Sequence, residues 1–204
     1  KSCAAAHQLP IIYVNQVGGQ DELVFDGGSF AIDAQGELSL SAQTFIEAFP
    51  IVTVDRSSDP RLVPGDTVAE REDLDAVWQA LVMGMRDYVD KNGFPAVVLG
   101  LSGGIDSAVT LAVAADALGP ERVEAVMMPF RYTASMSVED AAAEAKALGV
   151  RFSNLSIEPL YEAFMTALAE EFVGLPANIT EENLQARCRG VLLMSISNKK
   201  NLLV

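Results

Sequence analysis

Cysteine and histidine are scarce in this sequence, which has two cysteines, Cys3 and Cys188, and a single histidine, His7. So few of these residues exclude a cysteine–histidine metal cluster and a disulfide framework. No apolar run reaches the ~18 residues of a membrane-spanning helix, and no signal-peptide pattern opens the chain. These absences predict a cytoplasmic protein without a membrane partner.

Basic residues are also few. The sequence has 14 lysines and arginines and 28 aspartates and glutamates, which gives a net charge of −14. A charge of this sign repels nucleic acid, so we expect small-molecule substrates and no nucleic acid as partners. Any phosphate ligand must then be held by local geometry rather than by the field of the whole protein.

Half of the 204 residues are hydrophobic, which is enough to bury a sizeable core. The chain begins at Lys1 rather than methionine and closes on the apolar run "NLLV", which resembles an interrupted strand. We therefore expect a piece of a longer protein, truncated at both ends.

Residues 1–55 have the pattern of a β-rich region. After a short helical segment, "LPIIYVNQV" is a strand candidate, and short apolar stretches then alternate with turn residues. Asp26-Gly27-Gly28 and Gln35-Gly36 are typical of hairpin turns. Residues 56–70 contain prolines, a glycine and scattered charges without apolar periodicity, which predicts a linker.

From residue 71 the period of the apolar residues changes to that of a helix, which we expect to end near Asn92-Gly93. Beyond it, strands at 96–101, 123–128 and 151–157 alternate with helices at 106–118, 138–148, 160–172 and 181–197, and a last strand follows. This succession predicts a doubly wound α/β domain over residues 71–204, with a parallel sheet covered by helices.

Local signals predict how these helices begin and end. Ser137 with Asp140 resembles a capping box, Thr180 is the expected N-cap of the last helix, and Gly149 is expected to end a helix in the left-handed conformation. Residues 129–137 are expected to form a loop, which is either a plain connection or a mobile segment that closes over a ligand.

The stretch "LSGGIDS", Leu101 to Ser107, follows the first strand of the predicted sheet. Ligands bind at the carboxyl ends of strands in open parallel sheets, where a loop meets the next helix. Gly103 and Gly104 allow positive φ and let consecutive amide N–H groups face a ligand, and the helix N-terminus adds a positive field. With the hydroxyl groups of Ser102 and Ser107, this pattern predicts a phosphate-binding loop.

Asp106 is the unexpected residue of this stretch, because a carboxylate repels phosphate unless a cation lies between them. It is therefore a predicted Mg²⁺ ligand. In the simpler alternative, the stretch is a tight turn in which Asp106 caps the following helix. A Walker A loop is excluded because no lysine follows the glycines, and the dinucleotide fingerprint G-x-G-x-x-G does not fit.

The segment "SGGIDS" is similar to the signature of the PP-loop ATP pyrophosphatases, which cleave ATP between the α and β phosphates and adenylate a substrate. Three further stretches, "MMPFRYTASMSVEDA", "NITEENLQARCRG" and "VLLMSISNKKNLLV", resemble the NAD⁺ synthetases of that group. Residues 9–38 resemble the C-terminal, β-rich part of the nitrilase-like αββα glutaminase domain that precedes the synthetase domain in glutamine-dependent NAD⁺ synthetases. The resemblance thus implies the end of a glutaminase domain in 1–55 and the beginning of a synthetase domain in 71–204.

This resemblance implies a carbon–nitrogen ligase that uses ATP, Mg²⁺, deamido-NAD⁺ and glutamine. ATP adenylates the nicotinate carboxylate of deamido-NAD⁺, and ammonia from glutamine then displaces AMP. The family also implies a homo-oligomer, a dimer or larger. The ATP-binding residues that it implies are Gly100, Leu101, Ser102, Gly103, Gly104, Ile105, Asp106, Ser107 and Met128, with Asp106 as the metal ligand.

Asn183 and Arg187 are four residues apart and share one face of the last predicted helix. The resemblance assigns Asn183 to deamido-NAD⁺ and makes Arg187 and Arg189 candidates for its phosphate or carboxylate groups. Arg189 is turned away from the Asn183–Arg187 face by roughly 120°.

No catalytic residue of the glutaminase is expected within this chain. The family's Glu-Lys-Cys triad lies upstream of the matching stretch, and Cys3 belongs to a helical segment, whereas the family's cysteine follows a strand. We expect Cys3 to be structural. The family also has a loop with Thr and Glu that completes the synthetase site downstream of the part matched here.

Two other functions stay open on the sequence alone. PP-loop enzymes also include GMP-synthetase-like amidotransferases and tRNA-modifying enzymes, although a net charge of −14 disfavours tRNA. Alternatively, the chain is a truncated ATP-binding module without catalysis.

Overall fold

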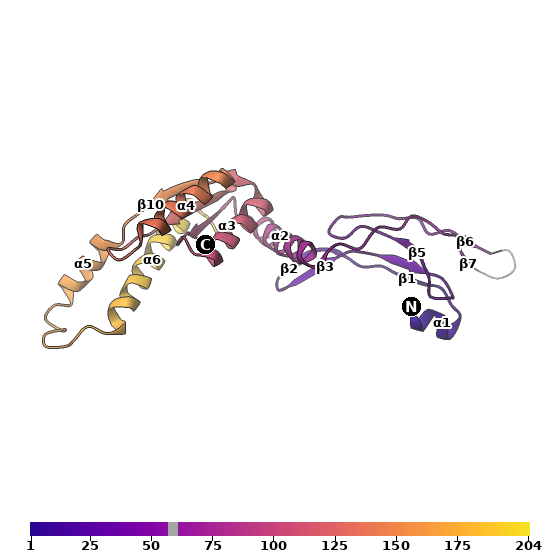
Figure 1. Cartoon of the computed structure of the whole chain (residues 1–204), viewed down its shortest axis with the longest axis horizontal. Coiled ribbons are helices and arrows are strands. Elements are labelled where there is room, and N and C mark those ends of the chain that lie inside the picture. Colours follow the sequence, from indigo (N-terminus) through magenta and orange to yellow (C-terminus); the bar gives the residue numbers. More distant parts are fainter. Residues whose placement is uncertain (57–60) are drawn as a thin grey trace. The chain divides into compact units, whose positions relative to one another are not determined.

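The structure is a computed structural model that describes residues 1–56 and 61–204. The chain divides into two compact units, Lys1–Tyr88 and Val89–Val204 (Figure 1), which are described separately. No helix within the described residues is both long and apolar enough to cross a membrane.

The first unit is built from short strands with a helix at each end. Its helices are α1 (Ser2–His7) and most of α2 (Asp73–Lys91), and its strands are β1 (Ile11–Tyr13), β2 (Val17–Gln20), β3 (Leu23–Asp26), β4 (Phe30–Ile32), β5 (Leu38–Ser41), β6 (Val54–Asp55) and β7 (Arg61–Leu62). An antiparallel sheet in the order β1-β4-β5 carries the small core of Ala31, Leu40 and Leu62. The β-rich character predicted for this region is confirmed.

One of the two predicted hairpin turns is present. Strands β4 and β5 pair through a turn in which the Asp33 carboxylate accepts hydrogen bonds from the amides of Gln35 and Glu37, and Gly36 has a φ of 88°. The hairpin predicted at Asp26-Gly27-Gly28 is wrong, because β3 pairs with β2, whereas β4 pairs with β1 and β5. The two glycines, with φ of 74° and 56°, instead turn the chain from one sheet to the next.

The strand predicted over residues 9–17 is interrupted, since β1 ends at Tyr13 and β2 begins at Val17. Of the predicted linker 56–70, residues 57–60 lie outside the described residues. In the remainder, Arg61–Leu62 form β7, and the Gly65 amide and Asp66 carbonyl hydrogen-bond to Ser39 and Ser41. The domain boundaries at residues 55 and 70 stay predictions.

The second unit is a parallel sheet with helices on both faces, which confirms the predicted fold class. Strands β8 (Val97–Gly100), β9 (Val123–Met127) and β10 (Arg151–Asn154) lie in the order β10-β9-β8, all parallel. The expected last strand is reduced to one parallel bridge between Leu203 and Val97. The helices are α3 (Ile105–Leu118), α4 (Ser135–Leu148), α5 (Glu158–Ala167) and α6 (Ile179–Lys200), and a short 3₁₀ helix spans Pro120–Arg122.

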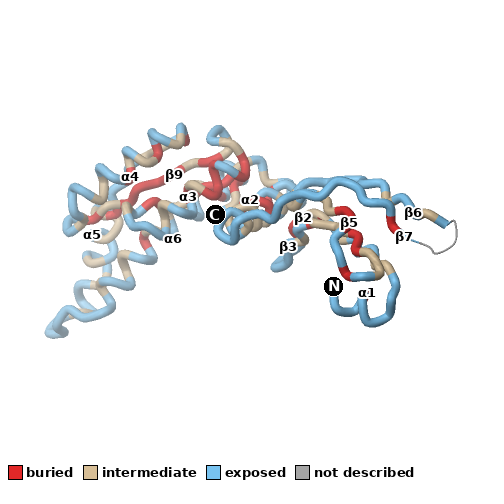
Figure 2. The backbone as a smooth tube through the Cα atoms, turned by 45° about the vertical axis from the view of Figure 1, so that its right-hand side comes forward, coloured by how far each residue is buried: buried red, intermediate tan, exposed pale blue. Residues whose placement is uncertain are grey.

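Side chains alternate between the two faces of this sheet. Val98 and Val126 face a core that includes Ile157 of the β10–α5 connection and Cys188 of α6. Their neighbours, such as Val97 and Ala125, face the other side, where the crossover helices α3 and α4 contact the sheet. The central strand β9 is buried along most of its length, whereas β10 has no buried residue and the outer surfaces of the helices are exposed (Figure 2).

Several predicted helix ends are corrected. Helix α4 begins at Ser135 after Ala134, so Ser137 lies in its first turn and does not form the predicted capping box. Helix α6 begins at Ile179, and its N-cap is Asn178 rather than Thr180. Asn178 and Glu181 form a reciprocal capping box, which leaves Thr180 as a helical residue. Gly149 ends α4 with φ 72° and ψ 17°, as predicted.

Candidate functional site

The stretch "LSGGIDS" lies where β8 ends and α3 begins, at the carboxyl edge of the parallel sheet. Leu101 anchors its start, because its side chain is almost fully buried and its amide donates to the Val126 carbonyl at 2.9 Å. Ser102 and the residues after it leave the sheet and are largely exposed. The predicted loop is therefore a turn from a buried strand into solvent.

A network of short hydrogen bonds shapes this loop from inside. The hydroxyl groups of Ser102 and Ser107 lie 3.0 Å apart, and the Ser107 hydroxyl also donates to the Gly104 carbonyl at 2.9 Å. The amides of Ser102 and Gly104 donate to the Ser107 and Ser102 hydroxyl oxygens, each at 3.2 Å. The two serines thus hold the loop closed, which fixes where its remaining amides point.

Gly103 is required by its conformation and by its surroundings. Its φ is 79°, a region that residues with a side chain rarely adopt. A Cβ at this position would lie 2.3 Å from the carbonyl oxygen of Ser137, in the first turn of α4. The loop therefore packs directly against the backbone of the neighbouring helix, a contact that sequence reasoning missed because no residue pattern signals it.

The loop presents amide groups that form no hydrogen bond with the described residues. Within the described part of the chain, the Gly103 N–H forms no hydrogen bond. The first amides of α3, including those of Ile105 and Asp106, also have no partner inside their own helix. Free amides at the positive end of a helix form a site for an anion.

Asp106 lies in the first turn of α3 with its side chain exposed. The N-cap of α3 is Gly104, with no side-chain cap, so the simpler interpretation of Asp106 as a helix cap is wrong. No group of three or more His, Cys, Asp or Glu side chains that could bind a metal occurs among the described residues. A cation at Asp106 would therefore take its other ligands from a bound molecule or from water.

Met128 follows β9 and is brought next to the loop. Its side chain is buried, and a Cβ added to Gly100 would lie 3.0 Å from its terminal methyl group. Gly100 thus makes room for Met128 at the end of β8. A ligand at this edge would meet the backbone around Met128 rather than the thioether.

Asn183 and Arg187 lie one turn apart on α6, as predicted, and both are exposed. Among the described residues, neither forms a hydrogen bond or an ion pair with the loop. The structure places them on an accessible helix face but joins them to the loop by no contact. Their predicted role in binding deamido-NAD⁺ stays a prediction.

Arg189 lies on a different side of α6 and is partly buried. Its Nε donates a hydrogen bond of 3.1 Å to the Met128 carbonyl oxygen. The adjacent Cys188 is buried in the core, and this burial raises the pKa of its thiol, an effect that the nearby Arg189 partly opposes. Arg189 therefore faces the sheet rather than the surface shared by Asn183 and Arg187.

The segment between β9 and α4 is held by side chains that sequence reasoning did not assign. Arg131 forms ion pairs with Glu158 at 2.8 Å and Glu162 at 2.9 Å, and its guanidinium lies 5.0 Å from the centre of the Phe130 ring. The Thr133 hydroxyl accepts a hydrogen bond from the Phe130 amide. The loop is shorter than predicted, because Ser135 to Ser137 belong to α4.

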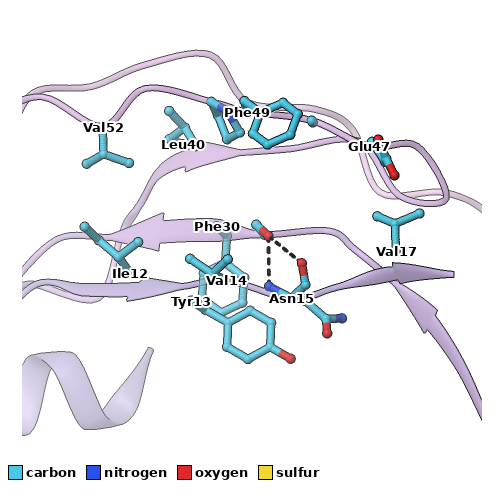
Figure 3. Close-up of a pocket in the computed structure, with 13 residues that line it drawn as sticks. Ile12, Tyr13, Val14, Asn15, Val17, Phe30, Leu40, Glu47, Phe49 and Val52 are labelled. Carbon is cyan, nitrogen blue, oxygen red and sulfur yellow. Dashed lines mark hydrogen bonds between the residues drawn. The ribbon is translucent and has the colours of Figure 1, made fainter.

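The first unit contains a cavity of about 440 Å³ (Figure 3). It is lined mostly by apolar side chains of β1, β4 and the segment around Phe49, and Ser29 and Asn15 hydrogen-bond to each other within it. None of the predicted site residues lines this cavity. The candidate site is thus an edge of the sheet built from backbone amides, and this cavity belongs to the other unit.

Comparison with known proteins gives a consistent result. A sequence model of the NAD synthase family matches residues 77–204. The chain is 49% identical over 194 residues to a glutamine-dependent NAD(+) synthetase from Acinetobacter baylyi, covering 93% of this chain and 35% of that protein. A second such synthetase, from Rhodobacter capsulatus, is 47% identical over 94% of this chain and 35% of its own length.

Solved structures agree with the sequence matches. The glutamine-dependent NAD+ synthetase from Acinetobacter baumannii, solved in complex with ADP, superimposes with a TM-score of 0.94 at 50% identity, over 98% of this chain and 38% of that one. This chain spans about 35% of the length of the curated relatives that it matches. The family resemblance inferred from "SGGIDS" and its accompanying stretches is confirmed. The chain belongs to the NAD synthase family.

Proposed function

We propose that the protein containing this chain makes NAD⁺ by ATP-dependent amidation of deamido-NAD⁺, with ammonia released from glutamine. The observation that carries this proposal is the Ser102–Ser107 loop, which presents unpaired amides at the N-terminus of α3. The relatives' names support the reaction, and ADP in the Acinetobacter baumannii structure supports ATP as the nucleotide.

The pyrophosphate of ATP would occupy the loop, against the free amide of Gly103 and the first amides of α3. Ser102 and Ser107 supply hydroxyl groups without adding charge, which suits an anion in a protein of net charge −14. Gly100, Leu101, Gly104 and Ile105 would shape the loop, and the backbone at Met128, next to Gly100, would contact the adenine. The loop would bind by geometry, because the net charge of this chain repels phosphate.

The donor set at Asp106 fits Mg²⁺. This ion is usually held by one or two carboxylates together with substrate phosphates and water, and Asp106 is one exposed carboxylate beside the phosphate-binding amides. The ion would neutralise charge on the phosphate oxygens. Asp106 would hold it at the pyrophosphate without a dedicated protein cage.

Asn183 and Arg187 would bind deamido-NAD⁺ from their shared face of α6. Arg187 has no partner among the described residues, so its guanidinium is available for a phosphate or carboxylate group of the substrate. Asn183 offers both a donor and an acceptor one turn away. The two side chains would orient the nicotinate carboxylate toward the α-phosphorus of ATP.

In the reaction, a carboxylate oxygen of the nicotinate bonds to the α-phosphorus while the bond to the β-phosphate oxygen breaks and pyrophosphate leaves. Ammonia then bonds to the adenylated carbonyl carbon, loses a proton, and AMP leaves with the bridging oxygen. The loop amides would stabilise the charge on the departing pyrophosphate, which is the main electrostatic task of this site.

Glutamine hydrolysis would take place in the domain to which residues 1–55 belong. The family's Glu-Lys-Cys triad is expected outside this chain, and Cys3 is exposed on α1. The protein is proposed to be cytoplasmic and homo-oligomeric.

Measuring NAD⁺ formed by the full-length protein from deamido-NAD⁺, ATP and glutamine tests this function. We expect product with glutamine or with ammonium, and a loss of roughly 100-fold or more in kcat for Asp106→Asn, since one electrostatic contact to transition-state charge contributes that much. Arg187→Met should raise mainly the KM for deamido-NAD⁺. No NAD⁺ from either nitrogen source would contradict the proposal.

A further inference from the structure

The contact between Arg189 and Met128 joins α6 to the carboxyl end of β9. The bond uses the Nε atom of Arg189 and not the tip of the guanidinium, and its length is 3.1 Å. Arg189 is the only one of the three predicted substrate residues on α6 that faces the sheet in the described structure. Its role therefore requires a separate explanation.

The pairing of β8 with β9 shows which hydrogen bond Arg189 replaces. Gly100 is the register partner of Val126, and the Leu101 amide donates to the Val126 carbonyl at 2.9 Å. Bonds of a parallel ladder recur every two residues along each strand. The next bond would therefore run from the Gly103 amide to the Met128 carbonyl.

That bond is absent because the loop leaves the sheet. Gly103 has a φ of 79° and packs on the Ser137 backbone, so its amide no longer follows the ladder. The Met128 carbonyl receives the Arg189 Nε instead. The carbonyls on either side are satisfied from the segment that follows β10, since the Leu155 and Ile157 amides donate to the Met127 and Pro129 carbonyls.

Helix α6 also packs against the strand that precedes the loop. A Cβ at Gly100 would lie 3.4 Å from a methyl group of Leu193, one turn after Arg189, and 3.0 Å from the Met128 methyl group. The helix thus contacts the ends of both strands that flank the candidate ATP site.

We propose that Arg189 is a positioning residue of this site: by donating to Met128 in place of Gly103, it keeps the end of β9 satisfied and leaves the Gly103 amide free for the ATP pyrophosphate. This inference rests on the proposed function for the identity of the ligand. It assigns Arg189 to the ATP half of the site, rather than to direct contact with deamido-NAD⁺.

Two substitutions separate these roles. In Arg189→Gln the side-chain amide nitrogen is separated from Cα by the same number of bonds as Nε is in arginine. This variant therefore keeps the hydrogen-bond donor and loses the positive charge. In Arg189→Lys a methylene group replaces Nε, so this variant keeps the positive charge and loses the hydrogen-bond donor at that atom. If Arg189 is a positioning residue, Arg189→Gln should keep the ATP affinity and Arg189→Lys should lose it. If Arg189 instead contacts the substrate through its charge, Arg189→Lys should keep binding and Arg189→Gln should lose it.

The experiment measures the ATP affinity of the full-length wild type, Arg189→Gln and Arg189→Lys by calorimetry with Mg²⁺ and without deamido-NAD⁺. We expect affinity within about twofold of wild type for Gln and roughly five- to tenfold weaker for Lys, the effect of losing one hydrogen bond. Arg151→Gln and Arg151→Lys are the matched controls, because Arg151 is an exposed arginine at the start of β10, away from the carboxyl edge of the sheet, and neither should change ATP affinity.

Hydrogen exchange of residues 96–104 without nucleotide provides a second readout. Compared with wild type, exchange should be faster in Arg189→Lys and unchanged in Arg189→Gln. Because no ligand is present, this result does not depend on which ligand the site binds. Equal behaviour of the two Arg189 variants, or loss in Gln alone, would overturn the positioning role. A wild type that binds no ATP would instead refute the proposed function, and the exchange data would still decide the role of Arg189.

Discussion

Gly103 is the residue on which the geometry of the site depends most. Its left-handed conformation turns the chain out of the sheet, and its missing side chain lets the loop approach the Ser137 backbone. The first requirement is visible in the sequence as a glycine after a strand. The second depends on the position of α4, which local sequence does not encode.

Gly103→Ala should therefore lower the free energy of unfolding by more than the positive φ at this position would by itself. A side chain in this conformation costs roughly 1–2 kcal/mol, and the overlap with the Ser137 carbonyl adds to that cost. Gly93→Ala is the matched control, because Gly93 also has a positive φ, 74°, but nothing within 4 Å of its added Cβ. Scanning calorimetry should show a larger fall in melting temperature for Gly103→Ala. Equal falls would contradict the close contact with Ser137.

At the scale of elements, the helix ends show what short-range signals can and cannot predict. The alternation of strand and helix segments located each helix of the second unit, and Gly149 marked the end of α4. Both predicted N-terminal caps were wrong, at Ser137 and Thr180. Ser, Thr, Asn and Asp are all good caps, so a segment with several of them does not reveal which one leaves the helical conformation.

The start of α6 can be tested directly. The Asn178 side chain accepts from the Thr180 amide at 2.8 Å, and Glu181 accepts from the Asn178 amide at 2.7 Å. Asn178→Ala should destabilise the first turn by about 1 kcal/mol, seen as faster hydrogen exchange over residues 179–184. Thr180→Ala removes only an exposed side-chain bond and should have a much smaller effect. A Thr180 effect as large as that of Asn178 would contradict the observed cap.

The β-rich unit was harder to predict than the α/β unit for a physical reason. In the second unit each strand is followed by a crossover helix, so chain order largely determines sheet order. In the first unit the strands are two to four residues long and pair with partners that the turns alone do not specify. Asp26-Gly27-Gly28 has the composition of a hairpin turn but connects two different sheets.

At the scale of the whole molecule, the family and the sheet of the second unit could be predicted from the sequence, and the ends of the strand and helix that flank the loop were each predicted within one residue. Contacts between distant segments could not be predicted. The bond from Arg189 to Met128 and the packing of Gly103 on Ser137 join residues from different elements, and only the folded chain brings them together.

The central claim is that the Ser102–Ser107 loop holds the pyrophosphate of ATP while a carboxylate is adenylated. The products of ATP cleavage test it most directly, measured with the full-length protein, deamido-NAD⁺ and ammonium. We predict that AMP and pyrophosphate form in equal amounts with NAD⁺, and that all three are lost in Asp106→Asn. Formation of ADP and inorganic phosphate in step with NAD⁺ would contradict it.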